Sequence, residues 1–136
     1  MAYTKPLPHP TKEDEPFWQA AKEHRLILPK CRACGHVWFP PYASCGKCLS
    51  LDRDWVEVSG RGKVWGYVHM QQPYLKSFVD DIPYNVVLVQ LDEGPLMFSN
   101  VVDAEAEAIR VDMPVEVVFG DVTEEFTLLK FRPAGQ

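Results

Sequence analysis

The motif Cys31-Arg32-Ala33-Cys34 is followed, after ten residues, by Cys45-Gly46-Lys47-Cys48, and the two pairs hold every cysteine of this 136-residue chain. Each CxxC turn points two sulfurs at one spot, and four thiolates at this spacing can close a tetrahedral shell around one Zn2+ ion. We therefore predict a zinc ribbon whose metal ligands are Cys31, Cys34, Cys45 and Cys48.

Two other uses of the cysteines are weaker. Disulfides would need two separate bridges where one metal shell explains all four residues. A redox CxxC would use one pair and leave the other idle. A shell of four sulfurs leaves no open position for water or substrate, so the predicted zinc is structural. We expect Gly35 and Gly46 to serve the sharp turns of the two pairs.

Composition is that of an ordinary soluble domain, with 46% hydrophobic and 24% charged residues. No apolar run approaches the roughly 20 residues of a membrane span, and no secretory signal is visible at the N-terminus. With reduced, metal-binding cysteines, these features predict a cytoplasmic protein. Residues 61–136 carry 6 Lys and Arg against 12 Asp and Glu, a net charge of −6, which disfavours binding to a nucleic-acid backbone.

The first sixteen residues contain four prolines, which predict an extended arm, either a disordered tail or an arm across a partner subunit. Glu13-Asp14-Glu15-Pro16 is typical of a helix start, and we expect the helix to run to about His24. Its predicted apolar stripe, at i, i+3, i+4, i+7 spacing, comprises Phe17, Ala20, Ala21 and His24. Trp18 lies beside this stripe, either in a small core or facing a partner.

Short strands account for the rest of the chain. We predict strands at 25–30, which leads into Cys31, and then at 37–39, 55–58, 63–72, 84–91, 96–102, 115–119 and 126–132. Five strands from residue 63, with the longest excursion between the third and the fourth, fit a small OB-fold barrel, and an open meander is the runner-up. The fold class is thus mostly β: an N-terminal helix, a rubredoxin-like zinc ribbon and a five-stranded OB-fold barrel. The corresponding divisions are residues 1–25, 26–56 and 57–136.

Alternation along 63–72 predicts which side chains are exposed. Val64, Gly66, Val68 and Met70 are expected to face the barrel interior. Trp65, Tyr67 and His69 then share the outer face and form a contact patch for a protein or an acyl-CoA tail, unless the N-terminal helix covers them. We group Phe17 and Trp18 with these candidate contacts. A catalytic role for His69 would need a nucleophile or carboxylate beside it, which the sequence does not place there.

Several stretches occur in an order and spacing that resemble one known family. They are Lys5-Pro6-Leu7-Pro8, residues 17–21, residues 31–36 with Phe39-Pro40-Pro41, residues 58–64, residues 83–95 and residues 113–119. Together they resemble the zinc-ribbon/OB-fold proteins that accompany thiolase-superfamily enzymes, over nearly the whole chain. No single stretch is diagnostic.

The resemblance implies a non-catalytic accessory subunit of a thiolase or a thiolase-like aldolase or lyase that acts on acyl-CoA thioesters. One reaction it implies for the partner is the retro-aldol cleavage of a steroid side-chain CoA ester. The implied assembly is a hetero-oligomer built on the partner's dimer, in which the partner holds most of the acyl-CoA and contributes the catalytic groups. No catalytic residue is carried over to this chain, and neither nucleic acid nor membrane is an expected partner.

Two other functions stay open at this point. A single-stranded nucleic-acid-binding OB module would use aromatic side chains on an exposed strand face, although the acidic half of the chain opposes it. An independent small-molecule enzyme would use His69 or a carboxylate, but the sequence offers no triad, no open metal site and no cofactor loop.

Overall fold

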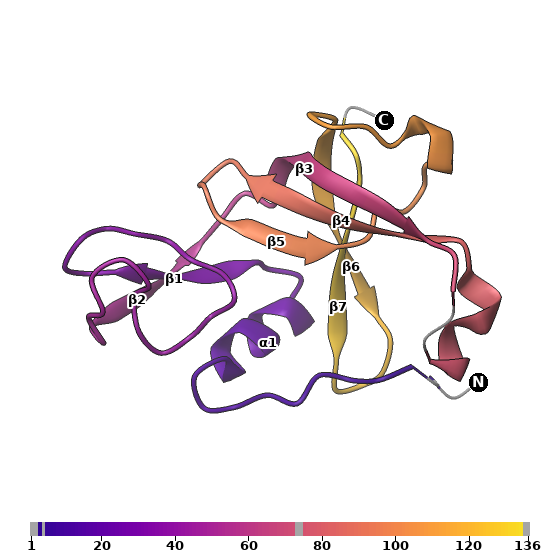
Figure 1. The fold of residues 1–136 in the computed structure, drawn as a ribbon. Helices are drawn as coiled ribbons and strands as arrows, with labels where there is room; N and C mark the ends of the chain where they lie inside the picture. Colours follow the sequence, from indigo (N-terminus) through magenta and orange to yellow (C-terminus); the bar gives the residue numbers. More distant parts are fainter. Residues whose placement is uncertain (1–2, 4, 73–74, 135–136) are drawn as a thin grey trace.

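The computed structural model describes residues 3, 5–72 and 75–134. These residues form one α-helix, two short 3-10 helices and two β-sheets, whose arrangement is drawn in Figure 1. The elements follow in the order α1 (Glu15–Lys22), β1 (Ile27–Cys31), β2 (Arg53–Glu57), β3 (Arg61–Met70), η1 (Lys76–Asp81), β4 (Tyr84–Leu91), β5 (Leu96–Ser99), η2 (Ala106–Ala108), β6 (Pro114–Asp121) and β7 (Thr127–Pro133). The predicted mostly β class, with a helix, a ribbon and a curled OB-like sheet, is confirmed. Within the described part, no helix is long and apolar enough to cross a membrane.

The helix α1 is shorter than predicted because its C-terminal turn is closed by a left-handed residue. His24 has φ of 60°, and the Arg25 N–H donates to the Ala20 carbonyl at 2.9 Å, which is the pattern of a Schellman cap. Phe17 and the two helix alanines are buried, as the stripe predicts. The prediction that His24 continues this stripe is wrong: its side chain lies outside the helix, exposed and stacked on Phe119 with ring centroids 5.2 Å apart.

The cap also places His24 against the β6–β7 hairpin. Its Nε2 lies 3.1 Å from Asp121 Oδ1, and the hydroxyl of the buried Thr127 donates to the same carboxylate. The hydrogen bond from Thr127, followed by the contact with His24, lowers the pKa of Asp121. These contacts join the end of α1 to the far end of the sheet.

Acid should therefore weaken this junction. Because the pKa of Asp121 is lower in the folded state, its stabilising contribution is fully present above about pH 4 and is lost as pH falls through the folded pKa. We expect Asp121→Asn to reduce the loss of unfolding free energy below pH 4, measured by urea denaturation at several pH values. Asp92→Asn, in the exposed β4–β5 turn, is the control. Equal acid dependence in the wild type and in Asp121→Asn would contradict the assignment.

The ribbon is a two-stranded antiparallel sheet in which β1 pairs with β2, from Ile27 opposite Glu57 to Cys31 opposite Arg53. Both CxxC pairs lie in the excursion between the two strands, apart from Cys31 at the end of β1. The predicted strand at 37–39 is reduced to a single bridge between Val37 and Lys30. The segment that carries the cysteine pairs is therefore connected to the rest of the molecule through this one short pair of strands.

The second sheet has the strand order β5-β4-β3-β6-β7. Because β6 pairs with β3 and not with β5, this is the OB-type arrangement and not the meander that was the alternative. The sheet curls so that the segment after β5 meets β7 through a single parallel bridge, Val101 to Phe131. The barrel is thus joined at one point and incomplete along the rest of this seam.

One apolar core joins the helix, the base of the ribbon and the curled sheet. Fully buried Val64, Val87, Val89 and Phe131 from the sheet pack in the same cluster as Phe17, Leu26 and Leu28. A second, small cluster consists of Cys31, Trp38 and Cys45 at the metal end of the ribbon. The base of the ribbon is therefore stabilised by hydrophobic burial, whereas its tip has almost no core of its own.

The prediction of which β3 side chains face the barrel interior is wrong from the middle of the strand onward. A β-bulge at Trp65 shifts the register, so that Val64 lies opposite Val89 but Tyr67 lies opposite Val87. Because directly paired residues share a face, Tyr67 and His69 fall on the face of the buried valines, and Val68 falls on the other face with 54% of its surface exposed. The predicted outer strip of Trp65, Tyr67 and His69 does not exist.

The proline-rich arm lies along its own chain. Lys5 Nζ forms an ion pair with Asp81 at 2.8 Å and sits 5.7 Å from the ring centroid of Phe78. Farther along, Arg53 donates to the Glu13 carbonyl at 2.8 Å. The arm contacts η1 and the ribbon of its own chain (Figure 1), so the prediction of a disordered tail is wrong for these residues, while an arm that reaches a partner subunit stays a prediction.

Candidate metal centre and contact surfaces

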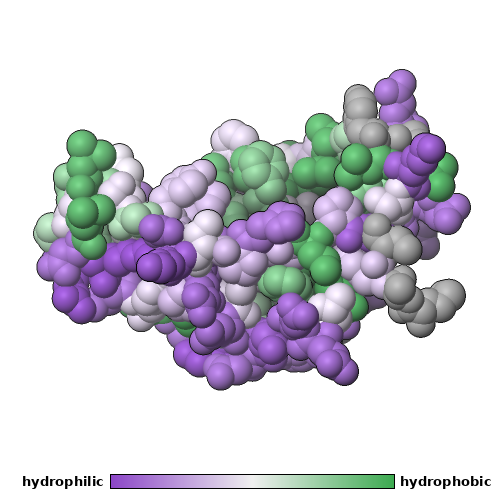
Figure 2. Space-filling view, turned by 90° about the horizontal axis from the view of Figure 1, so that it is seen from below, coloured by the Kyte–Doolittle hydropathy of each residue, from purple (hydrophilic) through white to green (hydrophobic). Residues whose placement is uncertain are grey.

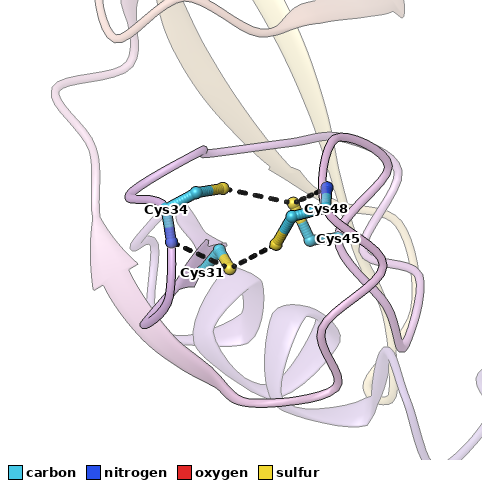
Figure 3. A group of neighbouring side chains, drawn as sticks. All are labelled: Cys31, Cys34, Cys45 and Cys48. Atoms are coloured by element: carbon cyan, nitrogen blue, oxygen red, sulfur yellow. Dashed lines mark hydrogen bonds between the residues drawn. The ribbon is translucent and has the colours of Figure 1, made fainter.

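The four cysteine sulfurs converge at the tip of the ribbon (Figure 3). All four Sγ atoms lie within 4.8 Å of one another; Cys31 and Cys48 are 3.5 Å apart, and Cys34 and Cys45 are 3.7 Å apart. Zinc–sulfur bonds of about 2.3 Å in a tetrahedron place the sulfurs roughly 3.8 Å apart. The donor set and its spacing therefore fit a metal ion with four thiolate ligands, as predicted for these cysteines.

Both knuckles have the same backbone geometry. Gly35 N–H donates to the Cys31 carbonyl at 2.9 Å, and Leu49 N–H donates to the Cys45 carbonyl at 2.8 Å. Gly35 has φ of 79°, as expected for the turn residue, but in the second knuckle the left-handed residue is Leu49, with φ of 66°. The prediction that Gly46 is needed for its conformation is therefore wrong, and a leucine occupies the position that favours glycine.

We expect Leu49→Gly to raise the free energy of unfolding of the metal-bound protein by about 1 kcal/mol, since it removes the left-handed strain of a side chain that is 76% exposed. Leu51→Gly is the matched control: Leu51 is 74% exposed and has no positive φ, so its replacement costs up to about 1 kcal/mol. Urea denaturation measures both variants. A destabilised Leu49→Gly would show that the Leu49 side chain packs in the native state.

Backbone amides favour the ionised form of two of the four sulfurs, those of Cys31 and Cys45. The Cys34 N–H donates to Cys31 Sγ at 3.4 Å, and the Lys47 N–H donates to Cys45 Sγ at 3.3 Å. The hydrogen bond from the Cys34 backbone is the main cause that lowers the pKa of Cys31 to about 7. Thiolates are the metal-binding form, so the knuckle backbone favours the state that binds a cation.

His36 lies beside this site without joining the sulfur group. Its ring stacks on Trp38 with centroids 6.1 Å apart, and its carbonyl accepts the Cys31 N–H at 2.8 Å. Among the described residues, the four cysteines are the only group of three or more His, Cys, Asp or Glu side chains placed to hold a metal ion. The centre is closed by protein sulfurs and offers no position for a substrate.

The predicted contact residues do not form one surface. Tyr67 and His69 lie together with ring centroids 5.6 Å apart, while Trp65 is alone at the bulge with 56% of its surface exposed. Phe17 is buried in the main core, and Trp18 is half-buried with its ring edge on Phe126. Their role in binding a partner or acyl-CoA stays a prediction.

Sequence reasoning missed a groove between the helix and the open side of the barrel. It has a volume of about 330 Å3, and its lining includes Phe17, Trp18, Phe39, Phe98, Leu129 and Lys130. Phe98 is 71% exposed although it lies in the strand β5. The only feature of the sequence that could have indicated this groove is Phe98, an aromatic residue in a short strand. Such a residue does not by itself distinguish an edge strand from a central strand.

Comparison with known proteins agrees with this architecture. Family models match in two places: the ChsH2 rubredoxin-like zinc ribbon domain over residues 18–52, and the ChsH2 C-terminal OB-fold domain over residues 55–120. A solved structure titled "Ltp2-ChsH2(DUF35) aldolase" contains a chain with 35% sequence identity and a TM-score of 0.83, and the match covers 94% of this chain and 99% of that one.

Two curated relatives differ in length. A "DUF35 domain-containing scaffold protein" of Methanocaldococcus jannaschii is 34% identical, over 79% of this chain and 77% of the relative. A "Probable enoyl-CoA hydratase alpha subunit" of Thermomonospora curvata is 38% identical over 89% of this chain, but the chain spans only 38% of that protein. In fold and in sequence along almost its whole length, this chain belongs to the ChsH2 (DUF35) family of zinc-ribbon/OB-fold proteins.

Proposed function

We propose that this protein is a non-catalytic accessory subunit that binds a thiolase-superfamily enzyme and supports its action on acyl-CoA thioesters. The observation that carries the proposal is the near-complete match to one chain of an aldolase complex, at 35% identity over 99% of that chain. The closed four-sulfur centre supports it, because such a centre contributes fold stability and no open coordination site for chemistry.

The metal in this proposal is structural zinc. Four thiolates in a tetrahedral arrangement are the donor set that zinc prefers among common cellular divalent cations. The residues that would hold it are Cys31, Cys34, Cys45 and Cys48, and the ion would tie the two knuckles together at the ribbon tip. Metal analysis of the purified protein tests this: we expect about one zinc per chain.

The surface of the ribbon supports an assembly role. Leu49 and Leu51 are both about three-quarters exposed, and Figure 2 shows hydrophobic side chains at the ribbon end of the molecule, on the left of the view. Tyr42, which is 64% exposed, lies in the same excursion between the two ribbon strands. Exposed apolar groups of this kind are common at protein–protein contacts.

The finer part of the proposal concerns the partner's reaction. We propose retro-aldol cleavage of a steroid side-chain CoA thioester, in which the partner contributes the catalytic groups and holds most of the acyl-CoA, in a hetero-oligomer built on the partner's dimer. The structural relative is an aldolase by name, which supports this reaction class. The steroid acyl group in this proposal rests on the family resemblance alone, because no residue of this chain indicates it.

The nucleic-acid alternative loses its main geometric support. It requires aromatic side chains in one row on the same face of the sheet. The bulge in β3 places Trp65 and Tyr67 on opposite faces. The net negative charge of residues 61–136 also disfavours binding to the phosphate backbone of a nucleic acid.

Co-expression with any thiolase-like enzyme that is encoded beside this gene tests the proposal. We expect a stable complex in size-exclusion chromatography, with turnover of an acyl-CoA thioester by the complex and none by this chain alone. Activity of the isolated chain, or no complex with any such enzyme, would overturn the proposal. Oligonucleotide titrations at two salt concentrations test the alternative.

A further inference from the structure

The incomplete seam of the barrel leaves one strand edge free. After β5, the segment meets β7 in a parallel ladder: the Phe131 N–H donates to the Asn100 carbonyl at 2.9 Å, and the Val102 N–H donates to the Phe131 carbonyl at 2.7 Å. One step earlier the ladder is interrupted: the Leu129 carbonyl accepts the Ser99 hydroxyl at 2.9 Å, and among the described residues no bridge pairs Ser99 with Leu129. From this point toward the start of β5, the seam is open.

The pairing of β4 with β5 shows which groups of β5 point into the opening. The Leu91 N–H donates to the Pro95 carbonyl, and Leu88 lies opposite Phe98. Since antiparallel pairs alternate between bonded and non-bonded positions, Met97 and Ser99 bond to β4, and the N–H and C=O of Phe98 point away from it. In the strand order β5 stands at the edge of the sheet, and among the described residues its strand pairing is with β4.

The groove of about 330 Å3 lies directly along this free edge. It is bounded on one side by residues 97–100 and on the other by Leu128, Leu129 and Lys130, and α1 with the Phe39-Pro40-Pro41 turn forms its remaining wall. Figure 1 shows α1 below β5 and beside β7. A free strand edge that faces a helix across an apolar groove is the arrangement in which extended peptides are bound by strand addition.

A cation lies at the end of this groove. Lys130 Nζ donates to Asn100 Oδ1 at 2.9 Å, and among the described residues no carboxylate is within 4.0 Å of it. Burial, with a smaller effect of nearby Lys5, lowers the pKa of Lys130. A half-buried ammonium that donates to one neutral group keeps unused donors, and a carboxylate placed there would accept hydrogen bonds from them.

We infer that the free edge of β5 accepts an extended apolar segment of the partner enzyme as an added strand, with a carboxylate of that segment at Lys130. Backbone groups of Phe98 supply the strand hydrogen bonds, and the groove receives the alternate side chains of the segment. A helix could not use the free amide and carbonyl in this way, and a purely apolar ligand would leave them unpaired. The inference rests on the proposed function, because the segment belongs to the partner.

Paired substitutions at Phe98 separate strand addition from simple apolar contact. Phe98→Ala removes only the side chain, whereas Phe98→Pro also removes the N–H that points away from β4. Proline is tolerated at such edge positions. With the co-expressed partner, we expect about a tenfold weaker Kd for Phe98→Ala and roughly a further tenfold loss for Phe98→Pro. Lys130→Met is expected to weaken binding by about tenfold.

A second measurement does not depend on any variant. Amide hydrogen exchange of the wild-type protein is expected to slow at Phe98 on complex formation. Val111→Ala, at a residue 55% exposed in the loop before β6, is the control and is expected to bind like the wild type. Equal affinity of Phe98→Ala and Phe98→Pro, with unchanged exchange at Phe98 in a complex that does form, would overturn strand addition alone. Failure of the wild type to form any complex would overturn the proposed function and this inference with it.

Discussion

Removal of the metal is expected to unfold the ribbon tip while leaving the curled sheet folded. Metal binding contributes roughly 10 kcal/mol or more in isolated zinc modules, and the tip has only Cys31, Trp38 and Cys45 as its own buried cluster. The base of the ribbon is different, because Leu26 and Leu28 are buried in the main core. After chelation, we expect amide exchange of residues 32–52 to become fast, while amides of β3 and β4 stay protected.

Single-ligand variants test the same point without a chelator. Cys45→Ser is expected to release the metal and to give the same exchange pattern, with increased solvent exposure of Trp38 seen in its fluorescence. Ala33→Ser, inside the first CxxC and exposed, keeps all four thiols and is the control. Loss of protection in β3 and β4 together with the tip would show that the two parts fold as one cooperative unit.

Replacement of Gly62 by alanine is expected to be among the most destabilising single changes in the sheet. A Cβ on Gly62 would collide with the backbone carbonyl oxygen of Gln90, and it would lie 3.0 Å from Leu91 Cα. Both neighbours are backbone atoms of the paired strand β4, so they cannot move aside without breaking the ladder. We expect a loss of roughly 1–3 kcal/mol or more in the free energy of unfolding, measured by urea denaturation.

Gly66 is the matched control in the same strand. A Cβ built on Gly66 meets no atom within 4 Å, so Gly66→Ala is expected to be neutral or to stabilise the fold by up to about 1 kcal/mol, through the reduced entropy of the unfolded chain. Similar losses for the two variants would mean that the cost comes from general strand disruption and not from the close approach of β3 to β4 at Gly62.

The metal site and the order of the elements were predictable from the sequence because they depend on local spacing. The positions of Cys31, Cys34, Cys45 and Cys48 along the chain determine a four-thiolate centre whatever the rest of the fold does. Strand β4 was predicted with its observed bounds, since its Val/Leu run is continuous and is framed by turn residues. The helix was predicted two residues too long, because the left-handed cap at His24 has no glycine to signal it.

The contact surfaces could not be predicted in this way. Alternation along 63–72 assigns faces only if each residue has one partner, and the bulge at Trp65 breaks that condition. The sequence likewise contains no sign of which strand edges meet, because closure of the barrel depends on contacts between residues 30 positions apart.

Local patterning by itself therefore determined the metal ligands and the mostly β class, since each depends on residues close together in the chain, and the order of several stretches along the chain determined the family. The tertiary structure alone decided that Tyr67 turns away from Trp65, that the arm packs on its own subunit, and that the barrel seam opens at Ser99. The physical reason is that these features depend on register and on long-range hydrogen bonds, whose partners are chosen only when the sheet curls.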